Sequence, residues 1–218
     1  GSYVALYEIN MDKNDAEHIS IPITDKLTKR WGITADQLYQ DTIKVQAAWN
    51  QPLLADLLEM GTYLNGGTRP DNLLSADKID DTGLYVLTNY KLYNGAAMIA
   101  HDEMAQKIGN LLQMDYYILP STVHELLVYP DNGVISITQL QEMVKSVNAT
   151  DVLPKDRLSD KVLFYNQQER RLELATEREE YFEDKTEDTQ EKKELAEGKD
   201  KSESEKKEDK SLKFSIRL

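Results

Sequence analysis

The sequence of 218 residues contains no cysteine. This absence excludes disulfide scaffolds, zinc ribbons, iron–sulfur clusters and thiol nucleophiles, and it gives no reason to expect an oxidising compartment. No apolar run approaches the roughly 20 residues that cross a bilayer. Basic residues are outnumbered by acidic ones, 26 to 39, and the formal net charge of -13 argues against a surface that binds nucleic acids or anionic membranes. These absences predict an acidic cytoplasmic protein with no direct nucleic-acid or membrane partner.

The charged residues are concentrated near the end of the chain. Residues 176–210 hold 15 acidic and 9 basic side chains and very few apolar ones. Such a segment cannot bury enough apolar surface to offset about 1–2 kcal/mol of backbone entropy per residue, so it is predicted to be a disordered or helical linker. The sequence therefore divides into a domain at 3–175, which is either one unit or two lobes that meet near 65–82, the linker, and a terminal peptide at 211–218.

The first part of the domain predicts a β-hairpin followed by helices. Ile19, Ile21 and Ile23 alternate with other residues and would share one face of a strand. Helix-capping residues then precede apolar residues at helical spacing, and Gly32 and Asn50 are stop signals. The expected elements are strands at 3–9 and 18–23, and helices at 24–32, at 34–50 and from 52 to about 60.

The second part of the domain predicts short strands with helices inserted between them. A loop at 65–72 precedes it, and a turn at 130–133 closes one of its strands. Thr138 is the expected cap of the last helix. The expected strands lie at 84–88, 96–99, 116–119, 125–129, 161–165 and 171–174, and the helices at 102–112 and 138–148. The fold class is therefore α+β, with short, mainly antiparallel strands.

Several of these segments, in this order, resemble a bacterial family of domains of unknown function, DUF5688, that occurs in Gram-positive gut bacteria and mobile elements. The resemblance is carried by Trp31-Gly32-Ile33-Thr34, by the segments at 84–97 and 117–125, and by Leu158-Ser159-Asp160. It extends over roughly residues 17 to 175. The resemblance implies a bacterial cytosolic domain, but it implies no activity and no catalytic residues.

Ser121, His124 and Glu125 form the most suggestive polar cluster in the sequence. A hydroxyl, an imidazole and a carboxylate between two strands could supply a nucleophile with a nearby base. No Gly-x-Ser-x-Gly elbow surrounds Ser121, however, and triads usually assemble from distant segments. The alternative interpretation is a turn in which these side chains form local hydrogen bonds.

Metal-binding and cofactor-binding patterns are weak. His124-Glu125 begins like the zinc-protease motif His-Glu-x-x-His, but Val128 occupies the position of the second histidine. The other histidines, His18 and His101, lie far away in the sequence. The Asn65-Gly66-Gly67-Thr68 loop lacks the Gly-Lys-Ser/Thr ending of a phosphate-binding loop. The sequence therefore predicts no metal site and no cofactor.

Twelve tyrosines against three phenylalanines are consistent with a surface that recognises a protein partner. Tyr85, Tyr117 and Tyr129 are the candidate binding residues within the strands. The alternative is a half-buried sheet whose outer positions carry tyrosine. At the end of the chain, Phe214 and Ile216 belong to an alternating apolar pattern that is typical of a docking strand or of the start of a further domain.

The leading hypothesis is therefore a non-enzymatic domain that binds a protein or serves as an accessory to one. It rests on the missing catalytic motifs, the tyrosine-rich strands and the β-like terminal peptide. The alternative is a hydrolase or metal-dependent enzyme centred on Ser121, His124 and Glu125. A third hypothesis is an acidic mimic of DNA, for which the carboxylates would have to line one face at spacings like those of phosphates.

Overall fold

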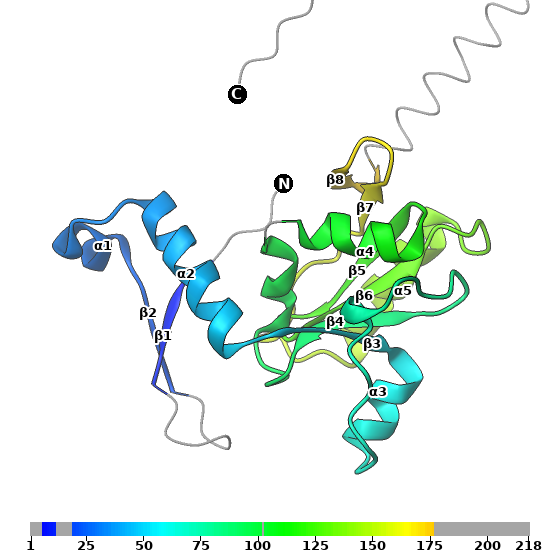
Figure 1. The fold of residues 1–218 in the computed structure, drawn as a ribbon, viewed down its shortest axis with the longest axis horizontal. Helices are drawn as coiled ribbons and strands as arrows, with labels where there is room; N and C mark the ends of the chain where they lie inside the picture. Colours follow the sequence, from blue (N-terminus) through cyan, green and yellow to red (C-terminus); the bar gives the residue numbers. More distant parts are fainter. Residues whose placement is uncertain (1–5, 12–18, 102, 177–218) are drawn as a thin grey trace, which may run out of the picture. The chain divides into compact units, whose positions relative to one another are not determined.

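The computed structural model describes residues 6–11, 19–101 and 103–176. An antiparallel six-stranded sheet forms its centre, and every neighbouring pair in it is antiparallel (Figure 1). The strand order across the sheet is β3 (Pro52–Asp56), β4 (Tyr85–Asn89), β6 (Glu125–Pro130), β5 (Tyr116–Thr122), β7 (Leu163–Asn166) and β8 (Arg171–Leu174). The predicted α+β class with antiparallel strands is confirmed, whereas the predictions for the linker and terminal peptide lie outside the described residues.

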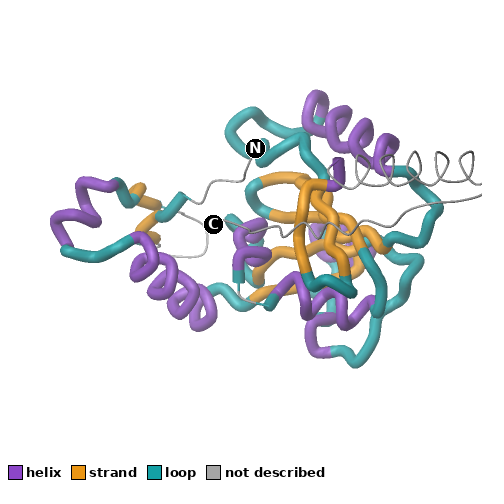
Figure 2. The backbone as a smooth tube through the Cα atoms, turned by 90° about the horizontal axis from the view of Figure 1, so that it is seen from above, coloured by secondary structure: helices purple, strands orange, loops and turns teal. Residues whose placement is uncertain are grey.

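Helices lie on both faces of this sheet (Figure 2). On β5, Tyr116 and Ile118 belong to the core cluster that includes α4 (Met104–Leu112). The residue between them, Tyr117, belongs to the cluster that includes Leu140 and Val144 of α5 (Ile137–Thr150). Because successive side chains of a strand point to opposite faces, this alternation places α4 and α5 on opposite sides of the sheet.

The segment after Pro52 corrects the prediction of a helix that starts there. Residues 52–56 form β3, and helix α3 (Leu57–Leu64) begins only after it. The Asp56 side chain caps α3 by accepting hydrogen bonds from the amides of Leu58 and Glu59, at 2.8 and 3.2 Å. Leu53 and Leu54 point to opposite faces and both are fully buried, so their apolar run carries no alternation that would mark a strand.

The outer edge of β3 is covered by a side chain. Asn72 accepts a hydrogen bond from the Leu54 amide at 3.2 Å and donates one to the Pro52 carbonyl at 2.8 Å. The amide group thus imitates one residue of a neighbouring strand, and it precedes the short 3₁₀ helix η1 (Leu73–Ser75). Covering an edge in this way removes a template for pairing with another chain.

Two further predictions differ from the structure. The expected strand at 96–99 is the 3₁₀ helix η2 (Gly95–Ala100). The cap of α5 is Ser136, not Thr138, because the Ser136 hydroxyl accepts from the Gln139 amide while the Gln139 side chain accepts from the Ser136 amide. This reciprocal capping box starts the helix earlier than predicted. The other predicted strands of the second part are confirmed, the last at the predicted residues 171–174 and the rest with shifted boundaries.

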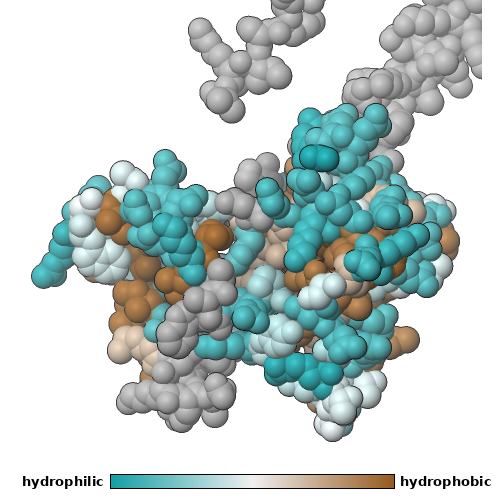
Figure 3. Space-filling model, in the orientation of Figure 1, coloured by the Kyte–Doolittle hydropathy of each residue, from teal (hydrophilic) through white to brown (hydrophobic). Residues whose placement is uncertain are grey.

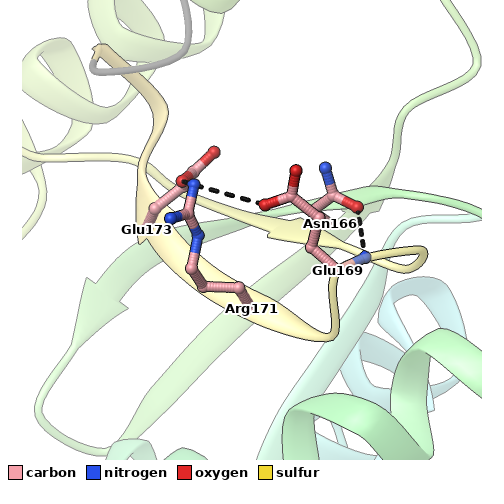
Figure 4. A network of polar contacts seen from close by, with 4 residues as sticks. All are labelled: Asn166, Glu169, Arg171 and Glu173. Atoms are coloured by element: carbon pink, nitrogen blue, oxygen red, sulfur yellow. Dashed lines mark hydrogen bonds and ion pairs between the residues drawn. The ribbon is translucent and has the colours of Figure 1, made fainter. Parts of the chain in front are cut away.

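The hairpin that connects β7 and β8 is held by polar side chains (Figure 4). Asn166 accepts a hydrogen bond from the Glu169 amide at 2.8 Å. Arg171 lies 3.4 Å from the Glu169 carboxylate and also pairs with Glu173. Since Arg171 and Glu169 are both exposed, these ion pairs define the turn more than they stabilise the fold.

The N-terminal part forms a separate two-stranded ribbon followed by two helices. β1 (Glu8–Asn10) pairs antiparallel with β2 (Ser20–Pro22), as the hairpin prediction requires, although residues 12–18 of the loop lie outside the description. Helix α1 (Asp25–Trp31) ends at Gly32, whose left-handed backbone has a φ of 71°. Helix α2 (Ala35–Trp49) starts after Thr34, whose hydroxyl accepts from the Gln37 amide. The signals for both helices are confirmed.

Candidate functional site

The predicted polar cluster lies at the tight turn between β5 and β6. Val123 and His124 connect the two strands, and Thr122 lies opposite Glu125 in the sheet register. The segment that contains Gly95 lies directly against this turn, because a Cβ on Gly95 would collide with the His124 carbonyl and with Thr88. Only glycine fits there without a shift of the backbone.

His124 joins three segments of the chain. Its Nδ1 accepts a hydrogen bond from the Asn94 amide at 3.1 Å, and its Nε2 lies 3.5 Å from an Asp156 oxygen. Its carbonyl accepts a hydrogen bond from the buried Thr88 hydroxyl at 2.8 Å. The Tyr93 ring lies beside the imidazole, with ring centroids 5.2 Å apart. A neutral imidazole that accepts at Nδ1 carries its proton on Nε2, which faces the Asp156 carboxylate.

Ser121 belongs to a different pair. Its hydroxyl donates a hydrogen bond to Glu125 Oε1 at 3.1 Å, across the same turn. The contacts described for the turn therefore join Ser121 with Glu125 and His124 with Asp156. In this arrangement the imidazole nitrogens face Asn94 and Asp156 rather than the serine hydroxyl. These contacts fix the turn against the segments that contain Asn94 and Asp156, so the side chains have a structural role here.

The three candidate tyrosines of the strands are buried. Tyr85 donates from its hydroxyl to the Asp80 carbonyl at 2.6 Å, and Tyr129 donates to Asn132 Oδ1 at 3.0 Å. The ring of Tyr117 packs beside Phe164, with centroids 5.3 Å apart. Each of these rings lies inside the sheet domain and is not presented on its surface. Phe214 and Ile216 lie outside the described residues.

Burial also raises the pKa of several tyrosines, Tyr85 and Tyr116 among them. Removal from water, reinforced by the negative charge of Asp80, raises the pKa of Tyr85 to about 12. Burial raises the pKa of Tyr116 well above its ordinary value as well. Both phenols therefore stay protonated at neutral pH and act as hydrogen-bond donors. Tyr85 donates to the Asp80 carbonyl, and Tyr116 donates to the Ala105 carbonyl at 2.8 Å.

The described residues contain no group of three or more potential metal ligands among histidine and the acidic residues. His124 has Asp156 as its acidic neighbour, and His101 lies at the end of η2, whereas His18 falls outside the description. Within the described ranges, no helix is both long and apolar enough to cross a membrane.

A surface that the sequence did not single out lies on the N-terminal ribbon. In an antiparallel pair, directly opposite residues share a face. Ile9 lies opposite Ile21, and hydrogen bonds join Met11 to Ile19 and Ile23 to Tyr7 in the same alternation. One face of the ribbon therefore carries only apolar and aromatic side chains: Tyr7, Ile9, Met11, Ile19, Ile21 and Ile23. We call these six residues the ribbon face.

Most of the ribbon face is exposed: Ile9, Met11, Ile19 and Ile21 are exposed, and Tyr7 and Ile23 are partly buried. Ile9 is 38% exposed and Ile21 is 45% exposed, and Figure 3 shows hydrophobic residues gathered around β1 and β2. Among the residues from 6 to 45 whose side chains the structure describes, none is buried. The alternation of Ile19, Ile21 and Ile23 predicted a common face, but nothing in it showed that this face would lack a cover.

Comparison with known families matches residues 4–167 to the model of a family of unknown function, DUF5688. The chain belongs to this family. The DUF5688 match starts before β1 and ends after β7, so it includes both the ribbon and most of the six-stranded sheet. The expected membership is confirmed, and the matching family is one of unknown function. No curated protein and no solved structure gives a significant match.

Proposed function

We propose that this DUF5688 domain is a non-enzymatic protein-interaction domain, and that the ribbon face is where its protein partner binds. The observation that carries the proposal is a row of six apolar and aromatic side chains on one face of a two-stranded ribbon, four of them exposed and two partly buried. Contiguous apolar surface of this kind marks interaction sites in soluble proteins. An isolated two-stranded ribbon is at best marginally stable, so a partner would also stabilise it.

The charge of this region supports a protein partner. The described residues 6–11 and 19–49 carry four acidic and four basic side chains, whereas the whole chain has a net charge of -13. An apolar, electrically balanced surface on an acidic chain avoids the repulsion that would oppose docking elsewhere. The polar side chains at the β5–β6 turn, by contrast, already have partners within the chain: Ser121 pairs with Glu125, and His124 pairs with Asp156.

Site-specific photo-crosslinking tests the proposal. The full chain carries a photoreactive phenylalanine analogue at Ile21 in one variant and at Val134 in the control. Val134 is 76% exposed and lies just before α5, far from the ribbon in the sequence. We expect a discrete protein adduct from position 21 and none from position 134 after irradiation in the native host cell. Equal labelling at both positions, or no adduct at position 21, would contradict the proposed function.

A further inference from the structure

The two outer edges of the ribbon differ. The Met11 amide donates to the Ile19 carbonyl at 2.8 Å, and the Ile23 amide donates to the Tyr7 carbonyl at 2.7 Å. In an antiparallel pair, bonded and non-bonded residues alternate, so the odd-numbered residues of β1 direct their backbone groups toward β2. The amides and carbonyls of Glu8 and Asn10 therefore point outward, along the free edge of β1.

The free edge of β2 is less able to pair. Its outward-pointing residues are Ser20 and Pro22, and proline has no amide hydrogen to donate. Within the described residues β1 has β2 as its neighbour on one side and no strand on the other. By contrast, the outer edge of β3 is covered by the Asn72 side chain. The edge of β1 is thus the one suited to receive another strand.

We propose that a second copy of this chain occupies that edge, with β1 pairing antiparallel to β1 of the other copy about a twofold axis at Ile9. The two ribbons would join into one four-stranded sheet in the order β2, β1, β1, β2. A twofold interface uses the same patch on both chains, so a self-complementary strand is sufficient. This inference goes beyond the proposed function, because the second copy occupies the edge of β1 and leaves the ribbon face open to the protein partner.

The charges on β1 favour the register centred on Ile9. That register pairs all three residues of β1 with one another, placing Ile9 opposite Ile9 and Glu8 opposite Asn10 of the second copy. Centring on Glu8 instead would put two carboxylates directly opposite each other, which is destabilising. The Glu8–Asn10 pairs occur twice, and each joins a carboxylate acceptor to an amide donor.

The same register makes the ribbon face continuous. Ile21, Ile9 and their two counterparts would lie in one row across the four strands, since directly opposite residues share a face. The four-stranded sheet would be twice as wide across its strands as one ribbon, so its apolar side chains would form a layer and not a narrow strip. The balanced charge of the described residues 6–11 and 19–49 allows two such regions to approach without mutual repulsion.

Because the chain contains no cysteine, single-cysteine variants give a clean test of this geometry. Directly opposite residues of a non-bonded pair have Cα atoms about 4.5 Å apart, which lies within the range that a disulfide bridges. Two copies of Ile21 would be separated by three strand spacings, or about 14 Å, which is too far. Ile9→Cys is therefore the test variant, and Ile21→Cys, on the same face and similarly exposed, is the matched control.

We expect mild oxidation of the full chain to convert most of the Ile9→Cys variant into a disulfide-linked dimer, while the Ile21→Cys variant stays largely monomeric. Equal cross-linking of the two variants, or none in either, would overturn the proposed dimer. The photo-crosslinking experiment tests the ribbon face separately, because Ile21 would lie on the outer strand β2, two strand spacings from the nearest strand of the second copy. Failure of the cysteine test would leave the proposed function standing, and a missing adduct at position 21 would leave the dimer standing, so the two failures are distinguishable.

The register has its own test at Asn10. Asn10→Lys would place an ammonium group opposite Glu8 twice per dimer, whereas Asn10→Asp would place a second carboxylate there. Cross-strand pairs of this kind should separate the dimer dissociation constants of the two variants by about tenfold. Sedimentation equilibrium measures both constants. Ser146→Lys and Ser146→Asp on the exposed side of α5 make the same charge changes elsewhere and should differ little. Equal constants for the two Asn10 variants would contradict the register.

Discussion

The six-stranded sheet and the N-terminal ribbon are both built from antiparallel strands, but they differ in how they bury apolar side chains. Ile118 of β5 is fully buried between the strands and α4, and Leu54 at the edge strand is fully buried as well. Ile9 and Ile21 of the ribbon remain 38% and 45% exposed. The same residue type therefore stabilises the fold in one region and presents an apolar surface in the other.

The difference arises from the number of layers. The six-stranded sheet has helices on both faces, so every central strand contributes to two cores. The ribbon has two strands, and none of the side chains described from 6 to 45 is buried. Two strands expose too large a share of their surface to form a stable core of their own. The ribbon face is thus suited to be completed by another surface.

Truncating one isoleucine in each region should give the largest contrast. Ile118→Ala removes a fully buried side chain, and we expect it to lower the free energy of unfolding by about 2–5 kcal/mol. Ile21→Ala removes a half-exposed one, and we expect a loss below about 1 kcal/mol in dilute monomer. Urea unfolding followed by circular dichroism measures both. Similar losses for the two variants would show that the ribbon is part of the core after all.

Two glycines should respond in opposite directions to the same substitution. Gly95→Ala forces a methyl group against Thr88 and the His124 carbonyl, so we expect it to destabilise the fold by about 1–3 kcal/mol. Gly61 lies within α3 with open space around its Cβ position, and Gly61→Ala should stabilise by about 0.5–1 kcal/mol. Thermal unfolding of the two variants provides the measurement. A neutral Gly95→Ala variant would contradict the tight packing of the β5–β6 turn.

High pH should weaken the sheet domain through Tyr85. The pKa of this phenol is raised from 10 to about 12 in the folded protein, mainly by burial. The folded state therefore holds the proton more tightly than the unfolded state, so the stabilisation is fully present below pH 10 and is lost as pH rises toward about 12. Tyr85→Phe should reduce this loss. Urea unfolding at several alkaline pH values tests it, and an identical pH dependence in the two proteins would contradict the assignment.

Most of the antiparallel sheet could be predicted because its strands are short and bounded by turns. β3 could not, because Leu53, Leu54 and Ala55 are all fully buried and produce neither alternation nor a polar face. The helix start after it had a signal in Asp56, whose carboxylate caps α3, but the apolar spacing from Pro52 onward favoured an earlier start. Periodicity fails where both faces of a strand are covered.

The candidate site shows a different limit. The sequence placed Ser121, His124 and Glu125 together at a turn, which the structure confirms, but it gave no indication of Asp156 as the neighbour of His124. That contact joins segments 32 residues apart, and no local pattern encodes it. The ribbon face was visible as alternation, whereas its exposure depends on which other elements fail to cover it. Tertiary contacts decide both features.

The smallest predicted effect concerns α5, the helix that packs on one face of the six-stranded sheet. In α5, Ser136 and Gln139 form a reciprocal capping box, so Ser136→Ala should cost about 1 kcal/mol of unfolding free energy. Thr138, which the sequence alone favoured as the cap, lies inside the helix and is exposed. Thr138→Ala should therefore be neutral or slightly stabilising, because alanine has the higher helix propensity. The opposite order in thermal unfolding would place the start of α5 at Thr138. It would also weaken the contrast between a sheet covered by well-anchored helices and a ribbon whose described side chains all remain at least partly exposed.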